Sequence, residues 1–515
     1  MNALAVLYGG SLSEAALEKV FSGKSALELA LERTASFPAV EKTLLLTGED
    51  RPLASAALPP GPYEIISRSN WTKKALLDTL ASASTGFDLT YYAWADCPLL
   101  DPLLAGAIRR RHLRFAAEYS YADGWPYGLA PEVFSPRTAR ILAQMLTKAE
   151  DAEEPVERDA VFSVIQEDIN SFDIETEISP VDLRHHRLTL CADSKRNLLL
   201  TARLFSAGLN SAASAEEIIA GRPELLRTLP NFYPIQAAGP CPQTCAFCPY
   251  PRSGLRDRTE GPQFLDPGDF AALLDKIEAF SGDAVVDLSL WGELSLHPRR
   301  EELIRLVLDR PALSLVIETS GLGWKTGELE ALAILARQAA PRKNRQAPLS
   351  WIVSLDAMHP ERYREVRGSG YPEAVACARQ LAALFPRDAY VQAVRVKGAE
   401  DDIEIFYRAW QGAGVQVIIQ KYDSFCGYLP ALQASDLSPV RRNPCWHLMR
   451  DMPVLLDGRV PCCREDIAGE RILGNALKED LEVLWARGEA LYREQTRSEY
   501  AGLCAGCDEY YTYNF

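Results

Sequence analysis

The sequence predicts an α/β protein in three parts: an N-terminal α/β sandwich, a central partial (β/α)6 barrel and a small cysteine-rich C-terminal domain. Three observations support this prediction. Short apolar runs alternate with helix-like stretches over most of the chain, which is typical of parallel sheets covered by helices. Polar residues follow several of these runs, at the strand ends where such sheets bind ligands. Cysteines gather near the C-terminal end, spaced as in metal sites.

The composition is that of a folded protein with a sizeable core. At 515 residues the chain is long enough for two or three domains. Hydrophobic residues make up 47% and charged residues 24%, which excludes a disordered chain. The net charge of −15 disfavours a nucleic-acid partner. No apolar run is long enough to span a membrane, and the first residues lack the basic region of a signal peptide, so we expect a cytoplasmic protein without membrane contacts.

The N-terminal part begins with three predicted strands, at Leu4–Tyr8, Lys42–Leu46 and Tyr63–Ile66, with helices between them. A fourth buried strand starts at Asp88 and delivers Asp96 to a turn bounded by prolines. We place this domain at residues 1–205. Residues 206–231 form a linker, in which prolines stop a short helix at both ends.

The central part, residues 232–432, opens on three cysteines. Cys241, Cys245 and Cys248 have the spacing C-x3-C-x2-C, and their three thiolates can bind three irons of a [4Fe–4S] cube. The fourth iron is left without a protein ligand, which suggests a place for a substrate or cofactor. The alternatives are three cysteines that are close by chance, or a zinc site with a distant fourth ligand.

Strands and helices alternate after the cysteines. The strands are expected at about 284–290, 313–319, 350–356, 389–396 and 415–421, and helices at Phe270–Phe280, Arg299–Leu308 and Glu373–Phe385. This order predicts a parallel sheet curled into a partial barrel.

The cysteine spacing and the strand ends together resemble radical S-adenosylmethionine enzymes. In that family the open iron takes the amino and carboxylate groups of S-adenosylmethionine, which is cleaved to a 5′-deoxyadenosyl radical. The resemblance implies that Gly292 and Glu293 approach the ammonium group of this cofactor. It further implies that Ser354 and Arg367 hold its carboxylate and that Phe247 lies near its adenine. The sequence departs from the family's Gly-Gly-Glu-Pro motif at Trp291 and Leu294, so this match is partial.

The C-terminal part, residues 433–515, carries four more candidate ligands: Cys445, Cys463, Cys504 and Cys507. Four thiolates are enough for a closed [4Fe–4S] cluster, although they could also bind zinc. The Cys-x12-Gly-x4-Cys opening, the hairpin-like stretch that starts at Leu455 and the late Cys-x2-Cys resemble the SPASM/twitch domain in its one-cluster form. Cys462 adjoins Cys463 but does not fit the glycine spacing.

Four further cysteines have no assigned role. They lie in apolar or mixed surroundings, and we expect ordinary buried thiols at Cys97, Cys191, Cys377 and Cys426.

The N-terminal strands, Asp96-Cys-Pro-Leu99 and the later Asp193 resemble sugar-nucleotide cytidylyltransferases. That resemblance implies Mg²⁺ held by Asp96 and Asp193. The chain departs from the family after Gly10, where no arginine-bearing phosphate loop follows, and at Asn197, where an aspartate is expected. We therefore expect a domain that keeps the fold and has lost nucleotidyl transfer.

The complete arrangement resembles the spiro-SPASM proteins of spirochaetes, a name that records an architecture and no substrate. It implies an enzyme that abstracts a hydrogen atom from a small-molecule substrate, with a sugar or nucleotide-sugar favoured by the N-terminal domain. A peptide substrate is one alternative, and a non-catalytic iron–sulfur binding or sensing protein is another. The resemblance also implies two [4Fe–4S] clusters, S-adenosylmethionine and a flavodoxin- or ferredoxin-type electron donor. The sequence names no catalytic acid or base.

Overall fold

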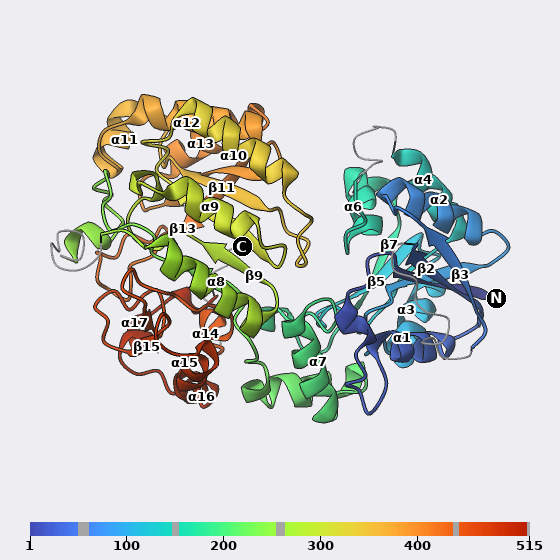
Figure 1. Ribbon diagram of the computed structural model, residues 1–515. Helices are drawn as coiled ribbons and strands as arrows, with labels where there is room; N and C mark the ends of the chain where they lie inside the picture. Colours follow the sequence, from blue (N-terminus) through green and yellow to red (C-terminus); the bar gives the residue numbers. More distant parts are fainter. Residues whose placement is uncertain (50–60, 147–153, 254–262, 436–441, 512–515) are drawn as a thin grey trace. The chain divides into compact units, whose positions relative to one another are not determined.

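The chain forms two compact units, Met1–Leu226 and Arg227–Phe515, in the computed structural model (Figure 1). The structure describes residues 1–49, 61–146, 154–253, 263–435 and 442–511. The boundary between the units falls inside the predicted linker, where short helical turns occupy Glu216–Ala220 and Pro223–Leu225. The boundary predicted between residues 432 and 433 lies within the second unit and stays a prediction. No helix in the described residues has the length and apolarity to cross a membrane.

The first unit is built on a seven-stranded sheet with the order β3-β2-β1-β4-β6-β5-β7. Strands β1 to β4 run parallel, whereas β6 is antiparallel to both of its neighbours. The strands are β1 (Ala3–Gly9), β2 (Val40–Gly48), β3 (Tyr63–Arg68), β4 (Leu89–Trp94), β5 (Tyr119–Asp123), β6 (Glu132–Phe134) and β7 (Ile174–Ile178). Every residue of β1 and β4 is buried, as expected of central parallel strands covered on both faces.

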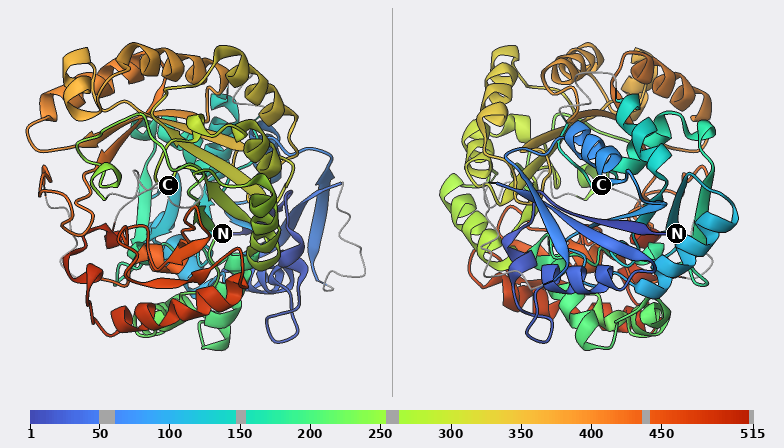
Figure 2. Two further views of the ribbon diagram at one scale, coloured as in Figure 1. Left: turned by 60° about the vertical axis from the view of Figure 1, so that its left-hand side comes forward. Right: turned by 90° about the vertical axis from the view of Figure 1, so that its right-hand side faces the viewer.

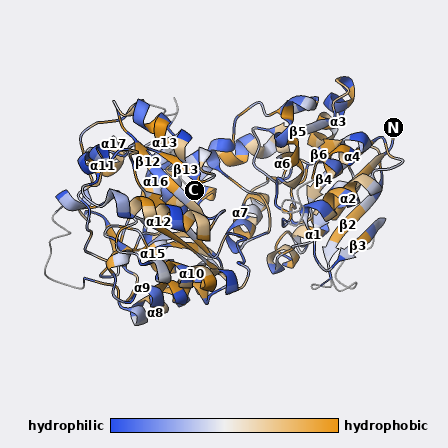
Figure 3. Cartoon of the chain, turned by 90° about the horizontal axis from the view of Figure 1, so that it is seen from above, coloured by the Kyte–Doolittle hydropathy of each residue, from blue (hydrophilic) through white to orange (hydrophobic). Residues whose placement is uncertain are grey.

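Helices cover both faces of this sheet. The helices α2 and α4 pack together over one face, and α1 and α3 lie over the other (Figure 2). The helices are α1 (Ala26–Ala35), α2 (Lys73–Ala83), α3 (Pro102–Arg114), α4 (Pro136–Met145), α6 (Ala160–Glu167) and α7 (Lys195–Ser206). Figure 3 shows that the strands are largely hydrophobic while the helices are mixed, which is the pattern that burial of the sheet requires.

The second unit contains a six-stranded, all-parallel sheet with the order β13-β12-β11-β10-β9-β8. The predicted α/β class and the five predicted strands are confirmed, and β8 is a strand that the sequence analysis did not name. The strands are β8 (Phe232–Pro234), β9 (Ala284–Asp287), β10 (Leu313–Thr319), β11 (Leu349–Ser354), β12 (Ala389–Arg395) and β13 (Gln416–Lys421).

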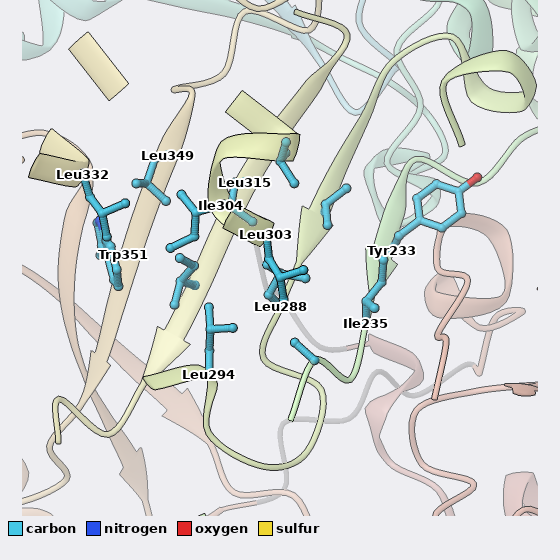
Figure 4. Packing of buried hydrophobic residues seen from close by; sticks show 14 of the residues in the cluster. Tyr233, Ile235, Leu288, Leu294, Leu303, Ile304, Leu315, Leu332, Leu349 and Trp351 are labelled. Carbon is cyan, nitrogen blue, oxygen red and sulfur yellow. The ribbon is translucent and has the colours of Figure 1, made fainter. Parts of the chain in front are cut away.

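The outer face of this sheet packs against helices and forms the main core. Alternate strand residues such as Leu315, Leu349 and Trp351 meet Leu303, Ile304 and Leu332 from the helices (Figure 4). The helices are α8 (Pro267–Ser281), α9 (Arg300–Leu308), α10 (Thr326–Gln338), α11 (Pro360–Val366), α12 (Tyr371–Leu384) and α13 (Glu400–Gly412). The other set of alternate residues points to the inner face, which is polar at its carboxyl end.

The cysteine-rich C-terminal segment belongs to the same unit because it shares this core. Residues 451–454 run beside β8, with Met452 N donating to Phe232 O (3.0 Å) and Val454 N to Pro234 O (2.8 Å). The predicted hairpin-like stretch is present as a tight turn, in which Leu455 N donates to Arg459 O (2.8 Å) and Gly458 N to Leu455 O (2.8 Å), and β14 beyond this turn pairs antiparallel with β15. The elements of this segment are α14 (Trp446–Arg450), β14 (Arg459–Pro461), β15 (Ile472–Asn475), α15 (Leu481–Arg487), α16 (Glu489–Thr496) and α17 (Leu503–Gly506).

Candidate metal and cofactor site

Cys241, Cys245 and Cys248 lie on the loop that follows β8, and their partly buried thiols form no disulfide. Burial raises the pKa of Cys241 to about 11 and that of Cys248 to about 12. The backbone N–H groups of Gln243 and Tyr250 act against this shift, because they favour the thiolates of Cys241 and Cys248 respectively. Buried thiols with amide groups directed at them suit a bound metal centre, which supplies the positive charge that thiolates need.

The turn at Gly292 and Glu293 lies directly against this cysteine loop. Glu293 N donates to Pro240 O at 2.9 Å. Gly292 has φ +78°, and a Cβ at this position would lie 1.9 Å from the carbonyl oxygen of Ala238. Only glycine allows this approach, so the glycine that the sequence analysis singled out has a steric reason.

The carboxylate of Glu293 is buried, with 4% of the residue exposed, and three donors fix its orientation. Thr319 Oγ1 donates to Oε1 at 2.7 Å, Ser320 N donates to Oε2 at 2.8 Å, and Ser295 N donates to Oε1 at 3.3 Å. A carboxylate oxygen can accept two hydrogen bonds, so Oε2 keeps capacity for one further donor.

Trp291 stands where the resembled motif has glycine. Its backbone φ is +51°, in the left-handed region. Its ring stacks on Tyr250, with centroids 6.0 Å apart and planes at 8°, and also contacts Phe425 at 5.5 Å. Because Tyr250 follows Cys248 by two residues, the tryptophan ties the Gly-Glu turn to the cysteine loop.

Arg367 contacts the same loop from another side. Its Nε donates to Gln243 Oε1 at 3.0 Å, and its carbonyl oxygen accepts from Thr244 N at 3.2 Å. The guanidinium also pairs with Asp356, whose other oxygen accepts from Val394 N at 2.7 Å. The structure thus places Glu293 and Arg367 against the cysteine loop, and their expected contacts with a cofactor stay a prediction.

Ser354 lies on the inner face of the sheet and contacts polar neighbours there. Its Oγ donates to Glu318 Oε1 at 2.6 Å, and Gln392 Nε2 donates to the same oxygen at 2.8 Å. Asp287 is near, and burial, together with the charge of Glu318, raises its pKa to about 7. Phe247 packs against a small apolar cluster of Val396, Ala399, Tyr422 and Leu429.

The four predicted C-terminal ligands also receive N–H donors. Glu465 N donates to Cys463 Sγ at 3.5 Å, Glu509 N to Cys507 Sγ at 3.4 Å and Gln495 Nε2 to Cys504 Sγ at 3.2 Å. The backbone N–H groups of His447 and Leu448 favour the thiolate of Cys445.

The spacing of the sulfurs bears on the choice between zinc and a cluster. Zinc with Zn–S bonds of 2.3 Å needs sulfurs about 3.8 Å apart in a tetrahedral site. Among the described residues, no three cysteine sulfurs all lie within 4.8 Å of one another. Within the described residues, neither cysteine group therefore has three sulfurs as close together as a single tetrahedral zinc ion would hold them.

One cysteine was misjudged from the sequence. Cys426 is expected to be an ordinary buried thiol, but it is only partly buried, and an interaction with Cys507, together with burial, raises its pKa. These residues are 81 positions apart, so no local spacing could have indicated the contact.

In the first unit, Asp96 and Asp193 do come together, but around an arginine. Arg158 donates to both oxygens of Asp96 (2.9 and 2.8 Å) and to Asp193 Oδ2 (2.8 Å). Its guanidinium also lies over the rings of Trp94 and Tyr127. Because the positively charged guanidinium of Arg158 lies between Asp96 and Asp193, where a shared Mg²⁺ would have to bind, the residues as arranged do not fit a Mg²⁺ site.

Comparison with known proteins assigns the chain to a family without naming its reaction. No family model matches the chain. An uncharacterized protein of Treponema pallidum (strain Nichols) is 38% identical over 362 residues, which cover 69% of this chain and 98% of that protein. The chain belongs to the same family as this Treponema protein.

Several solved structures are similar to parts of the chain. A structure of BtrN in complex with AdoMet and 2-DOIA has 17% identity and a TM-score of 0.36, and the match covers 55% of this chain and 94% of that one. A cytidylyltransferase from Leptospira borgpetersenii has 17% identity and a TM-score of 0.36, covering 44% of this chain and 95% of that one. At these scores the likeness identifies neither a substrate nor a reaction.

Proposed function

We propose that this chain is a radical S-adenosylmethionine enzyme with two [4Fe–4S] clusters, one at Cys241, Cys245 and Cys248 and one at the four C-terminal cysteines. The observation that carries the proposal is the convergence on one loop. Gly292–Glu293 and Arg367 are 44 or more residues beyond Cys248 in the sequence, yet both contact residues 238–246 through backbone and side chain. A metal site that only stabilises the fold would not need the Gly-Glu turn or Arg367 to contact its cysteine loop.

The roles of the residues follow from their positions. Glu293, fixed by three donors, keeps an acceptor position for an ammonium group, and the glycine before it allows close approach. Arg367 supplies a fixed positive charge beside Cys245. The carboxylate of S-adenosylmethionine would bind to this charge in competition with Asp356. The bound cluster and S-adenosylmethionine supply the radical chemistry, and Phe247 is proposed to lie near the adenine.

The inner face of the sheet supports a polar small molecule as the substrate. Glu318, Ser354 and Gln392 form a hydrogen-bonding group there, with Asp287 beside it. Such groups suit the hydroxyls of a sugar or nucleotide-sugar. Ser354 would then contact both the cofactor and the substrate. A peptide substrate is the alternative.

Iron counting tests the two clusters. Anaerobic reconstitution should give about eight irons per chain, and the Cys241/Cys245/Cys248→Ala variant about four. Zinc at the C-terminal cysteines, or an iron count unchanged by the triple substitution, would refute the proposal.

Cofactor cleavage separates the enzyme from a non-catalytic iron–sulfur protein. The reduced protein should form 5′-deoxyadenosine from S-adenosylmethionine even without substrate, and the triple variant should form none. Glu293→Ala and Arg367→Ala should keep both clusters and each weaken cofactor binding by about 1–3 kcal/mol, measured by calorimetry. Cofactor binding unchanged in both variants would show that these two roles are wrong.

A further inference from the structure

Two cysteines of the first unit, Cys97 and Cys191, have their sulfur atoms in direct contact. The sulfurs are 3.3 Å apart, although the residues are 94 positions apart in the sequence. Both residues are buried, with 2% and 0% of their surface exposed, and both are free thiols in this structure. The thiol of Cys97 also lies 3.7 Å from Asp96 Oδ1. The fold has therefore brought together two groups that can react with each other.

The backbone holds the two cysteines in this position. Cys97 comes three residues after the end of β4, and its N–H donates to Trp94 O at 3.3 Å. The N–H of Ala192, the residue after Cys191, donates to the carbonyl oxygen of Asp96 at 2.9 Å. The contact between the sulfurs thus rests on a direct hydrogen bond between their two segments. A disulfide has a bond length of about 2.05 Å, so the sulfurs would have to approach by only about 1.3 Å.

The neighbouring Asp96 is not available to make this pair a metal site. Arg158 donates to both of its oxygens, including the Oδ1 atom that Cys97 approaches. A metal ion bound by Asp96 and the two sulfurs would have to displace this guanidinium. The side chains of Arg158 and Asp193 are 20% and 21% exposed, so solvent reaches the far side of the same cluster. Access to the sulfurs therefore requires a small oxidant.

We propose that Cys97 and Cys191 form an oxidation site, at which a peroxide converts the two thiols into a disulfide. In the first step one thiol is oxidised to a sulfenic acid, and the peroxide is reduced to water. The sulfur of the other thiol then attacks the sulfenic sulfur. The S–S bond forms as the S–O bond breaks, and the thiol proton leaves with the oxygen as a second water. Two electrons pass from the sulfurs to the peroxide.

The bond would link the segment that carries Asp96 to the segment that carries Asp193. Arg158, which pairs with both aspartates, lies within the loop of the chain that the bond closes. Closing a long loop restricts the unfolded chain, so the oxidised protein should resist unfolding more than the reduced protein. This inference goes beyond the proposed function, because it requires neither a cluster nor any residue of the second unit.

Peptide mapping tests the inference on the full chain. The protein is treated with hydrogen peroxide, the remaining thiols are blocked under denaturing conditions, and a digest without reductant is analysed by mass spectrometry. We expect most chains to give a peptide pair linked through Cys97 and Cys191, and dithiothreitol should separate it. Cys97→Ser and Cys191→Ser should each abolish the pair. Cys377→Ser, which changes a buried thiol on α12, is the control and should leave the yield unchanged.

Urea unfolding provides the second measurement. Peroxide should raise the urea midpoint of wild type above that of Cys191→Ser treated in the same way, which also controls for oxidation elsewhere in the chain.

Three results would overturn the inference. The linked pair could be absent after prolonged treatment, or Cys97 could link equally to cysteines of the second unit. The purified protein could also hold a zinc ion that Cys97→Ser releases, which would make the pair a metal site. Iron content enters none of these results, so the inference can fail while the proposed function stands.

Discussion

Trp291 shows how one residue can replace a glycine in a tight turn. Its φ of +51° costs about 1–2 kcal/mol for a residue with a Cβ. Aromatic contacts contribute about 0.5–1.5 kcal/mol each, and Trp291 makes two, with Tyr250 and Phe425. The contacts are large enough to offset the backbone cost. This departure from the resembled motif therefore does not by itself argue against a functional site.

Gly292, the next residue, has no such freedom, which leads to a first prediction. Gly292→Ala places a Cβ against Ala238 O in addition to the cost of its positive φ. Gly398→Ala is the matched control, because Gly398 has φ +83° in the same unit and no atom within 4 Å of the added Cβ. We expect Gly292→Ala to destabilise the protein by about 1–3 kcal/mol more than the control, measured by urea unfolding. Equal costs would mean that the cysteine loop moves away freely.

Arg158 supports a second prediction, on the first unit. Asp96 is fully buried, so Arg158→Met leaves its charge without a partner and should cost about 3–5 kcal/mol. Arg184→Met is the control: this arginine pairs with Asp123 and Asp182 at the surface and should cost less than about 1 kcal/mol. Urea unfolding compares the two variants, and a loss below 1 kcal/mol for Arg158→Met would show that the buried pair is not needed.

At the scale of elements, much of the fold follows from the sequence. The runs at 313–319 and 389–396 match β10 and β12 because seven-residue strands of mostly apolar residues leave few alternatives. β8 was missed because it has only three residues, one of them proline. It is stabilised by residues 451–454, more than 200 positions away, which cover its free edge.

The candidate sites were predictable from the sequence only where their residues lie close together in the chain. The cysteine triplet and the Gly-Glu turn can be read from short motifs, and the structure brings them together. Arg158 carries no local signal, since it pairs with aspartates that are 35 or more positions away in the sequence. A single charged or sulfur-bearing residue is uninformative until the fold shows what it faces.

Strand β6 supports a prediction on pH. Burial, acting against a hydrogen bond from Tyr119 OH (2.8 Å), raises the pKa of Glu132 to about 7. Below about pH 4.5 this carboxyl is protonated in both the folded and unfolded states and does not affect stability. Between about pH 4.5 and 7 the folded state binds more protons, so stability falls as the pH rises. Because the pKa rises from 4.5 to about 7, the loss attributable to Glu132 is at most about 3.4 kcal/mol.

Glu132→Gln tests this directly, because the amide does not ionise. The variant should lose less stability than wild type when urea unfolding is repeated from pH 5 to pH 8. Equal slopes in the two proteins would place the pKa of Glu132 near its ordinary value.

At the scale of the whole molecule, two α/β units share one chain but differ in their candidate sites. The second unit gathers cysteines and a fixed carboxylate, whereas the first gathers aspartates around an internal guanidinium. We therefore expect no CMP-sugar to form when wild-type protein is incubated with CTP, Mg²⁺ and sugar acids, measured by release of pyrophosphate. Rapid product formation would contradict the loss of transfer and make the chain bifunctional.

The arginine of the first unit also differs from a metal ion in how it is supplied. A dissolved cation reaches a site in proportion to its concentration, and a chelator can remove it. Arg158 is tethered to the chain, so its effective concentration at the two aspartates is set by the fold and does not change with the medium. The charge balance of this unit should therefore be the same in a metal-starved cell as in a metal-rich one.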